Sequence, residues 1–201
     1  MGLTMRLKTL AALALGAAIL AGSAPAMAQS ASTPSFFSFL PRPSNFGNGP
    51  VKGYSSIRRQ VVPYTGTYKP GTIVVNTAER RLYLVQDNGT AVKYGIGVGR
   101  DGFRWGGVKT ITRKAEWPGW TPPAQMLQRR PDLPRYMPGG IDNPLGARAM
   151  YLGSTLYRIH GSNEPETIGQ AVSSGCFRMT NDDVTDLYDR VKVGTQVVVL
   201  N

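Results

Sequence analysis

The chain has 201 residues, of which 23 are Lys or Arg and 12 are Asp or Glu. Its formal net charge of +11 at pH 7 favours an anionic partner. Nucleic acid is not expected, because the sequence contains no known nucleic-acid module and no run of basic residues interleaved with aromatic ones. The short basic clusters are instead scattered, at Arg58-Arg59, Arg80-Arg81 and Arg129-Arg130.

Residues 1–28 have the pattern of a secretory signal peptide. Arg6 and Lys8 form a short positive region, residues 9–22 are apolar and rich in Leu and Ala, and residues 26–28 form an Ala-Met-Ala cleavage site. The apolar run is too short for a good membrane span. We therefore expect an exported protein of the periplasm or cell wall, with no transmembrane anchor after signal cleavage.

Residues 29–69 are rich in Ser, Pro, Gly and Asn and show no hydrophobic periodicity. Turn-forming residues at this density are typical of a linker, so we expect this segment to be mostly disordered. Pro70-Gly71 then marks the start of the folded domain, which is predicted to span residues 70–201. A domain of this size is large enough to bury a hydrophobic core.

The domain opens with a pattern of strands. Residues 72–75 are β-branched, and residues 81–86 place alternate apolar side chains on two faces, so both segments are predicted strands. Residues 87–89, Asp-Asn-Gly, form a hairpin-turn signal, and residues 91–98 alternate again. Three strands joined by short turns predict an antiparallel meander.

Residues 108–112 form the next predicted strand, and a long loop at residues 115–149 follows it. The loop is rich in Pro, which cannot continue a sheet, and it shows no sustained period. A loop this long inside a compact domain is usually functional, for example as a lid or a substrate wall. Its aromatic residues Trp117, Trp120 and Tyr136 are therefore candidate substrate-binding residues, with packing inside the loop as the alternative.

The rest of the domain is predicted to contain more strands and one amphipathic helix. Thr180 followed by two aspartates is typical of a helix start, because these acids favour the positive end of the helix dipole. Val184, Leu187 and Val191 recur at helical spacing. The other predicted elements are a short helix at residues 123–129 and strands at residues 149–152, 155–160 and 196–200. The expected fold is mainly β.

The sequence contains a single histidine, His160, and a single cysteine, Cys176. In an exported protein, an unpaired cysteine indicates a reactive thiol or an intermolecular disulfide, with a buried inert thiol as the alternative. An imidazole is the base that such a thiol needs near neutral pH. We therefore predict Cys176 as a nucleophile and His160 as its proton donor and acceptor. One His and one Cys fall short of a zinc ligand set, so no metal or cofactor is expected.

Small residues near Cys176 indicate how the site is completed. Gly175 permits a backbone turn that other residues disfavour, and in such a turn the N–H groups of Gly175 and Cys176 are the predicted oxyanion donors. No acid is an obvious partner for the imidazole, so the backbone carbonyl of Gly161 or Ser173 is expected to orient the ring. A serine nucleophile at Ser173 or Ser174 is the weaker alternative, because no Gly-x-Ser-x-Gly motif is present.

Residues 159–161, Ile-His-Gly, and residues 173–179, Ser-Ser-Gly-Cys-Phe-Arg-Met, resemble the catalytic motif of the YkuD-type L,D-transpeptidase family. The resemblance covers about residues 69–201 and implies a β-sandwich with one C-terminal helix and a long loop before the histidine. It places Arg178 near the substrate or the catalytic loop. Ser174 stands where the family often has a second histidine, and we assign it to substrate binding.

The resemblance also implies a function in the bacterial cell wall. Cys176 would attack the bond between the third, diamino acid residue and D-Ala of a peptidoglycan stem peptide, and His160 would deprotonate the acceptor amine. That acceptor is a second stem, a free D-amino acid or an outer-membrane protein, and carbapenems are expected to acylate the thiol. Two alternatives remain: an L,D-carboxypeptidase that gives the same thioester to water, and a non-catalytic wall-binding module.

Overall fold

The computed structural model describes residues 55–201, so the predicted signal peptide and most of the predicted linker lie outside the described residues. The first half of this region contains β1 (Gln60–Pro63), β2 (Ile73–Asn76), β3 (Arg81–Val85), β4 (Thr90–Gly95), β5 (Val98–Gly99), β6 (Gly107–Glu116) and α1 (Ala124–Arg129). The second half contains β7 (Arg148–Leu152), β8 (Arg158–His160), the 3-10 helix η2 (Pro165–Thr167), β9 (Ala171–Ser173), β10 (Phe177–Arg178), α2 (Asn181–Arg190) and β11 (Gln196–Leu200).

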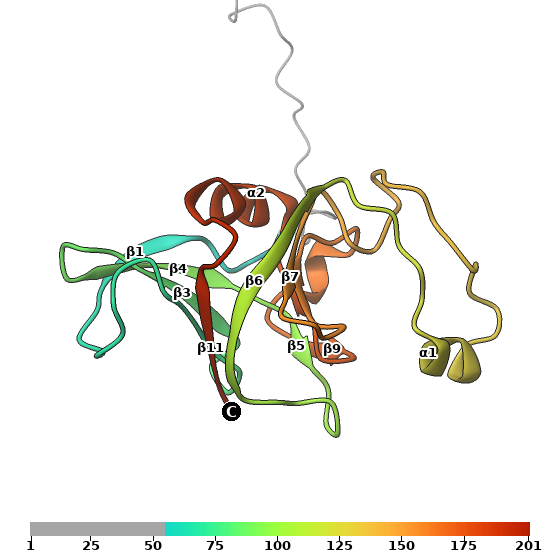
Figure 1. Ribbon diagram of the computed structural model, residues 1–201, viewed down its shortest axis with the longest axis horizontal. Helices are drawn as coiled ribbons and strands as arrows, with labels where there is room; N and C mark the ends of the chain where they lie inside the picture. Colours follow the sequence, from blue (N-terminus) through green and yellow to red (C-terminus); the bar gives the residue numbers. More distant parts are fainter. Residues whose placement is uncertain (1–54) are drawn as a thin grey trace, which may run out of the picture. The chain divides into compact units, whose positions relative to one another are not determined.

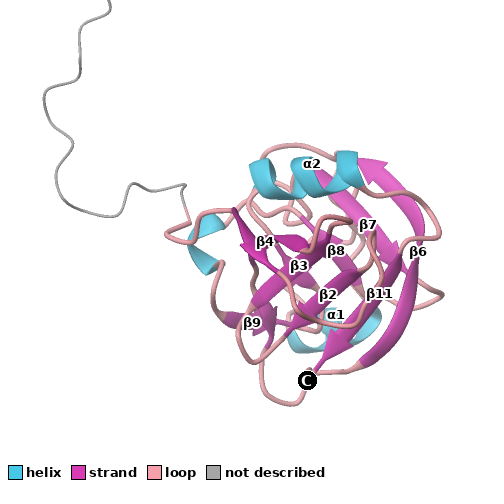
Figure 2. Cartoon of the chain, turned by 90° about the vertical axis from the view of Figure 1, so that its left-hand side faces the viewer, coloured by secondary structure: helices cyan, strands magenta, loops and turns pink. Residues whose placement is uncertain are grey.

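Within residues 55–201, nine strands form one sheet in the order β1-β4-β3-β2-β11-β6-β7-β8-β10, and β5 pairs with β9 in a second sheet. The prediction of a mainly β fold is confirmed (Figures 1 and 2). The predicted meander is also present, because β2, β3 and β4 pair antiparallel in sequence order. The C-terminal strand β11 lies between β2 and β6 and joins the two halves of the sheet.

The folded region begins earlier than the predicted boundary at residue 70. Strand β1 lies inside the segment that was expected to be a linker, and it pairs antiparallel with β4, with Val62 opposite Ala91. It is an edge strand, and three of its four side chains are exposed. Because neither face of β1 is buried, its residues carry no hydrophobic alternation, and the sequence pattern missed it.

Strand β6 continues to Glu116, although the pattern predicted a strand that ends at residue 112. The register between β6 and β7 shifts between Ile111 and Arg113, which interrupts the alternation of side chains. The long loop follows, and it contains α1 as predicted. In Figure 1 this loop projects from the ends of β6 and β7.

Helix α2 forms as predicted and packs against β7. The hydroxyl of Thr180 accepts a hydrogen bond from the backbone N–H of Asp183 at 3.1 Å, which caps the first turn. Leu187 is fully buried in the core. At the other end, the ammonium of Lys114 donates to the carbonyls of Tyr188 and Val191, each at 2.6 Å, and so binds the negative end of the helix.

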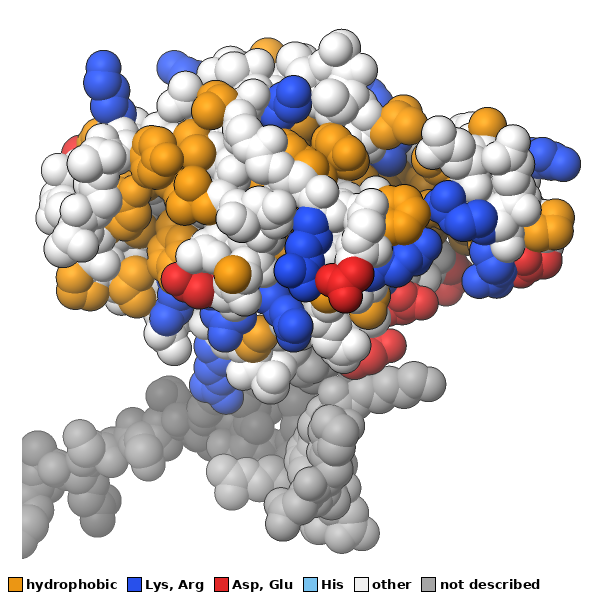
Figure 3. All heavy atoms as spheres, turned by 90° about the horizontal axis from the view of Figure 1, so that it is seen from below, with side chains coloured by type: hydrophobic (Ala, Val, Ile, Leu, Met, Phe, Trp, Pro, Cys, Tyr) orange, Lys and Arg blue, Asp and Glu red, His pale blue; other side chains and the backbone are white. Residues whose placement is uncertain are grey.

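Basic side chains lie in several separate groups on the face that Figure 3 shows, with hydrophobic side chains between them. This distribution agrees with the scattered basic clusters of the sequence. Among residues 55–201, none of the helices has the length and apolarity that a membrane span requires.

Candidate active site

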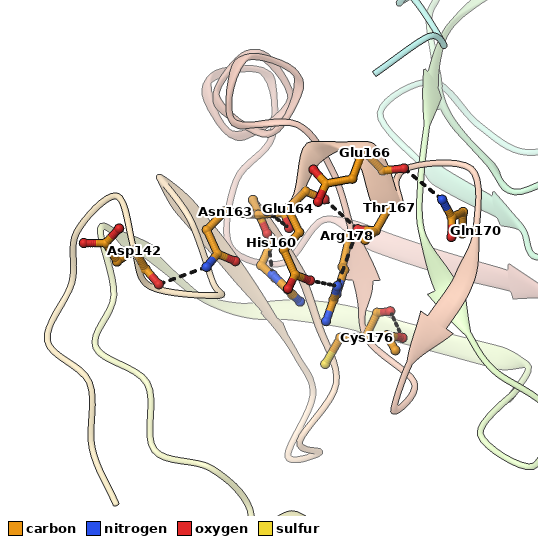
Figure 4. A network of polar contacts seen from close by, with 12 residues as sticks. Asp142, His160, Asn163, Glu164, Glu166, Thr167, Gln170, Cys176 and Arg178 are labelled. Carbon is orange, nitrogen blue, oxygen red and sulfur yellow. Dashed lines mark hydrogen bonds and ion pairs between the residues drawn. The ribbon is translucent and has the colours of Figure 1, made fainter. Parts of the chain in front are cut away.

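Two short parallel strands, β8 and β10, bring the predicted catalytic residues to one side of the sheet. Phe177 lies opposite Ile159, and Arg178 lies opposite His160. Ile159 and Phe177 are buried in the core, so the alternating neighbours His160 and Arg178 face the other way. Cys176 comes directly before β10, and Figure 4 shows its side chain directed toward the same region as those of His160 and Arg178.

These residues line a pocket of about 440 Å³. Of the other predicted site residues, Trp120, Ser173 and Ser174 also line it, whereas Trp117 and Tyr136 do not. Trp117 is 42% exposed and Tyr136 is 61% exposed. Further lining residues were not predicted, because they come from helix α1, strand β8 and separate loops: Phe103, Met126, Arg129, Pro144, Leu145, Leu156, Tyr157 and Arg158.

His160 is buried, and its Nδ1 atom lies 2.6 Å from the carbonyl oxygen of Gly161. A carbonyl only accepts hydrogen bonds, so we assign the ring proton to Nδ1, which leaves Nε2 as a proton acceptor. The carbonyl of Ser173, the other candidate, accepts instead from the backbone N–H of Arg100. Burial, helped by the positive charge of Arg178, lowers the pKa of His160 to about 3. The imidazole is therefore neutral near pH 7.

The thiol of Cys176 is half-buried and donates to the carbonyl of Leu156 at 3.6 Å. Burial raises the pKa of this thiol, while the charge and the backbone and side-chain N–H groups of Arg158, together with the charge of Arg178, oppose that shift. Within the described chain, the sulfur forms no hydrogen bond with His160. Because both groups are held neutral, the thiol must lose its proton as it attacks rather than rest as a thiolate beside an imidazolium.

The turn before Cys176 is fixed by three hydrogen bonds. The Ser173 hydroxyl donates to the carbonyl of Cys176 at 2.6 Å and accepts from the N–H of Gly175 at 3.2 Å. The indole N–H of Trp105 donates to the carbonyl of Gly175 at 2.7 Å. Gly175 has a φ of 105°, a conformation that favours glycine.

This turn leaves one of the two predicted N–H groups available to an oxyanion. The N–H of Gly175, one of the two predicted donors, is bound to the hydroxyl of Ser173. The N–H of Cys176 has no hydrogen-bond partner within residues 55–201. In a trans peptide the N–H points away from the preceding C=O, so the bond from Trp105 to the Gly175 carbonyl sets the direction of the Cys176 N–H.

Trp105 is thus a positioning residue, and Trp105→Phe tests it. The ring stacks on Tyr157 with 4.5 Å between centroids, and Phe retains a stacking ring while losing the N–H. We expect acylation of Cys176 to slow about tenfold, because misalignment of one oxyanion donor costs rate. Alkylation of the thiol by iodoacetamide should stay within about twofold, since that reaction forms no oxyanion. An equal loss in both reactions would contradict this assignment, and Trp117→Phe is the matched control.

Arg178 is paired with an acid that the sequence argument did not single out. Its guanidinium donates to the carboxylate of Glu164 at 2.9 Å and to the hydroxyl of Thr167 at 3.4 Å. Figure 4 shows this pair beside His160. Glu164 lies in the variable segment between the two motif halves, so no spacing identified it. Among the described residues, no three His, Cys, Asp or Glu side chains lie together as a metal site would require.

Residues 70–199 match the YkuD family, whose description is an L,D-transpeptidase catalytic domain. The chain belongs to this family. Among curated YkuD-type relatives, the "Probable L,D-transpeptidase ErfK/SrfK" of Escherichia coli K12 is 44% identical over 138 residues, which cover 64% of this chain and 44% of that protein. The chain spans about half the length of the curated relatives it matches.

Two solved structures extend the comparison. An L,D-transpeptidase from Mycobacterium smegmatis has a TM-score of 0.53 and 18% identity, covers 65% of this chain and 58% of its own, and shows the shared fold. A Brucella melitensis crystal structure has a TM-score of 0.50 and 51% identity over 73% of this chain and 95% of its own, under the name "Probable carnitine operon oxidoreductase caia". Membership of the YkuD family rests on the match over residues 70–199 and not on that name.

Proposed function

We propose that this domain is a peptidoglycan L,D-transpeptidase with Cys176 as its nucleophile. The observation that carries the proposal is that His160 on β8, Arg178 on β10 and Cys176 directly before β10 all line one pocket. The proposed donor is a tetrapeptide stem, cleaved between the L-centre of the third, diamino acid residue and D-Ala. The protein is proposed to be exported and to act in the periplasm or cell wall.

Acylation begins with a neutral thiol and a neutral imidazole. As the sulfur of Cys176 bonds to the carbonyl carbon of the diamino acid, Nε2 of His160 takes the thiol proton. The Cys176 N–H stabilises the negative charge that develops on the carbonyl oxygen. His160 then gives the proton to the amide nitrogen, the C–N bond breaks, and D-Ala leaves as an amine with a thioester on the enzyme. A His160 with a low pKa returns this proton readily.

Transfer of the acyl group reverses these proton movements. An acceptor amine attacks the thioester, His160 removes one of its protons, and the sulfur of Cys176 leaves and recovers a proton. A second pocket of about 650 Å³ adjoins the first through Ser174 and Arg178 and carries the carboxylates of Asp142 and Glu164. Arg100, Arg129, Arg130 and Arg178 also line this pocket, so its charge does not select an ammonium group. Its position beside the first pocket makes it a suitable approach for an amine on a second stem or on an outer-membrane protein.

The experiment that tests the proposal follows covalent mass on the protein. Residues 29–201 are incubated with a disaccharide tetrapeptide, with and without a second amine, and intact protein and products are weighed. An adduct on Cys176 together with an amine-linked product is the expected result. Tripeptide alone would instead indicate the L,D-carboxypeptidase, and no adduct with the stem or with a carbapenem would overturn the enzyme proposal in favour of a wall-binding module.

A further inference from the structure

The register of β8 and β10 places Arg158 beside the reactive thiol. Phe177 is level with Ile159, so one step back along the same register makes Cys176 level with Arg158. Side chains two residues apart on a strand share a face, so Arg158 emerges on the same side as His160. The thiol also donates to the carbonyl of Leu156, two residues before Arg158. Arg158 is therefore the charged residue level with Cys176 across the two strands. His160 lies two residues further along β8, level with Arg178.

The guanidinium of Arg158 has unused hydrogen-bonding capacity. Its Nε atom is buried and has no hydrogen-bond partner among residues 55–201. None of the ion pairs in that part of the chain includes Arg158, whereas Arg178 is held by Glu164 at 2.9 Å. The aromatic ring of Tyr151 lies 5.3 Å from the Cζ atom of Arg158 and supports it without accepting a conventional hydrogen bond. A buried N–H without an acceptor is unfavourable, so this site is suited to a ligand that supplies acceptor oxygens.

The pocket around Arg158 has the charge that an anionic ligand requires. Arg129, Arg158 and Arg178 line it, and no Asp or Glu does. A carboxylate presents two oxygens that match the fork of a guanidinium. Of the three arginines, Arg158 is the one level with Cys176, on a neighbouring strand about 4.8 Å away. An anion bound to it therefore lies next to the bond that the thiol attacks.

We infer that Arg158 binds the terminal carboxylate of the D-amino acid that leaves, and so selects stems that end one residue beyond the cleaved bond. This inference rests on the proposed function. In such a donor the carboxylate carbon is three bonds from the carbonyl carbon that Cys176 attacks, which fits a cation beside the sulfur. One further residue would move the carboxylate by about 3.5 Å, away from the guanidinium. Arg158 is thus a specificity-determining residue, while His160 transfers the protons.

Acylation kinetics with two matched donors test this inference. The first donor is a tetrapeptide stem with a free C-terminal carboxylate, and the second is the same stem with a C-terminal carboxamide. We expect the unaltered protein to react with the acid at least about tenfold faster than with the amide. In Arg158→Gln the ratio of the acylation rate with the acid to that with the amide should fall to within about twofold of one. Most of this change should come from a slower reaction with the acid. Arg158→Lys, which retains charge but not the fork, should give an intermediate ratio.

A control variant and a binding measurement separate this role from others. Arg113 contacts the same Tyr151 ring, with 3.6 Å between its Cζ atom and the ring centroid, but does not line the pocket, so Arg113→Gln should retain the original ratio. Equilibrium binding is measured in a Cys176→Ala background, where Arg158 has no thiol to act on. The acid should bind more tightly than the amide when Arg158 is present, and this preference should be lost when Arg158→Gln is added.

The outcomes distinguish the inference from the function on which it rests. An acid-to-amide ratio that Arg158→Gln and Arg158→Lys leave unchanged, with normal acylation, overturns the inference alone. Failure of the unaltered protein to form an adduct with either donor overturns both. If Arg158→Gln does not fold, as circular dichroism would reveal, the Arg158→Lys ratio and the binding measurement decide the matter.

Discussion

Replacing Cys176 with Ala is expected to abolish the acyl-enzyme and to reduce peptide transfer by more than about 10³-fold. The thiol is the only sulfur nucleophile in the sequence, and the neighbouring Ser173 is committed to the turn through its bond to the Cys176 carbonyl at 2.6 Å. Ser174 also lines the pocket, but no Gly-x-Ser-x-Gly motif surrounds it, so the thiol is the expected site of the covalent intermediate. Intact-protein mass after incubation with a tetrapeptide stem, and separately with a carbapenem, measures the loss.

The fold of the Cys176→Ala variant should persist. The substitution removes only the thiol and its long bond to the Leu156 carbonyl, while the backbone bonds of the turn remain. We expect the free energy of unfolding to change by no more than about 1 kcal/mol. Ser154→Ala is the matched control, because Ser154 is exposed and does not line the pocket. Adduct formation in the absence of the thiol would show that a different residue is the nucleophile.

Local chemistry explains which parts of the fold the sequence could predict. Strand β2 begins with a run of β-branched residues that are all buried, β3 and β4 intersperse buried apolar residues with less buried ones, and Gly89 has a φ of 71° in the predicted hairpin turn. Helix α2 could be predicted from its cap and its apolar stripe. Strand β1 could not, because pairing with β4 stabilises it through backbone hydrogen bonds, which leave no pattern in the side chains. Such edge strands are fixed by the sheet they join.

The site also contains some residues that the sequence could predict and others that it could not. Cys176 and His160 were identifiable because each is unique, and because thiol chemistry needs a base. The partners that orient them come from distant segments: Trp105 reaches Gly175 across 70 positions, and Arg158 is aligned with Cys176 only through the parallel register. Neither contact has a sequence spacing that could reveal it. The sequence therefore predicted the reacting atoms, and the sheet register was needed to identify what surrounds them.

His160→Asn is expected to slow acyl transfer by about 10²- to 10⁴-fold, the range for loss of a general acid–base. Asn is the appropriate replacement because its amide can still donate to the Gly161 carbonyl, which accepts from Nδ1 at 2.6 Å in the native chain. The pH midpoint of thiol alkylation should move by less than about one unit. A larger rise in that midpoint would show that the thiol rests as a thiolate paired with an imidazolium, contrary to the neutral pair inferred from the burial of both groups.

The same variant should remove a pH dependence of stability. In the folded chain the pKa of His160 is lowered to about 3, whereas an unfolded histidine titrates near 6.5. The unfolded state therefore binds the proton first, and stability falls as pH decreases from 6.5 toward 3. Between pH 7.5 and 5 the loss is about 2 kcal/mol, and His160→Asn should lack it. Urea unfolding at both pH values gives the change in the free energy of unfolding for each protein. The titrations of carboxylates are common to the two proteins, so they cancel when the changes are compared. Equal pH dependence in the two proteins would mean that the imidazole is solvated or protonated in the folded chain.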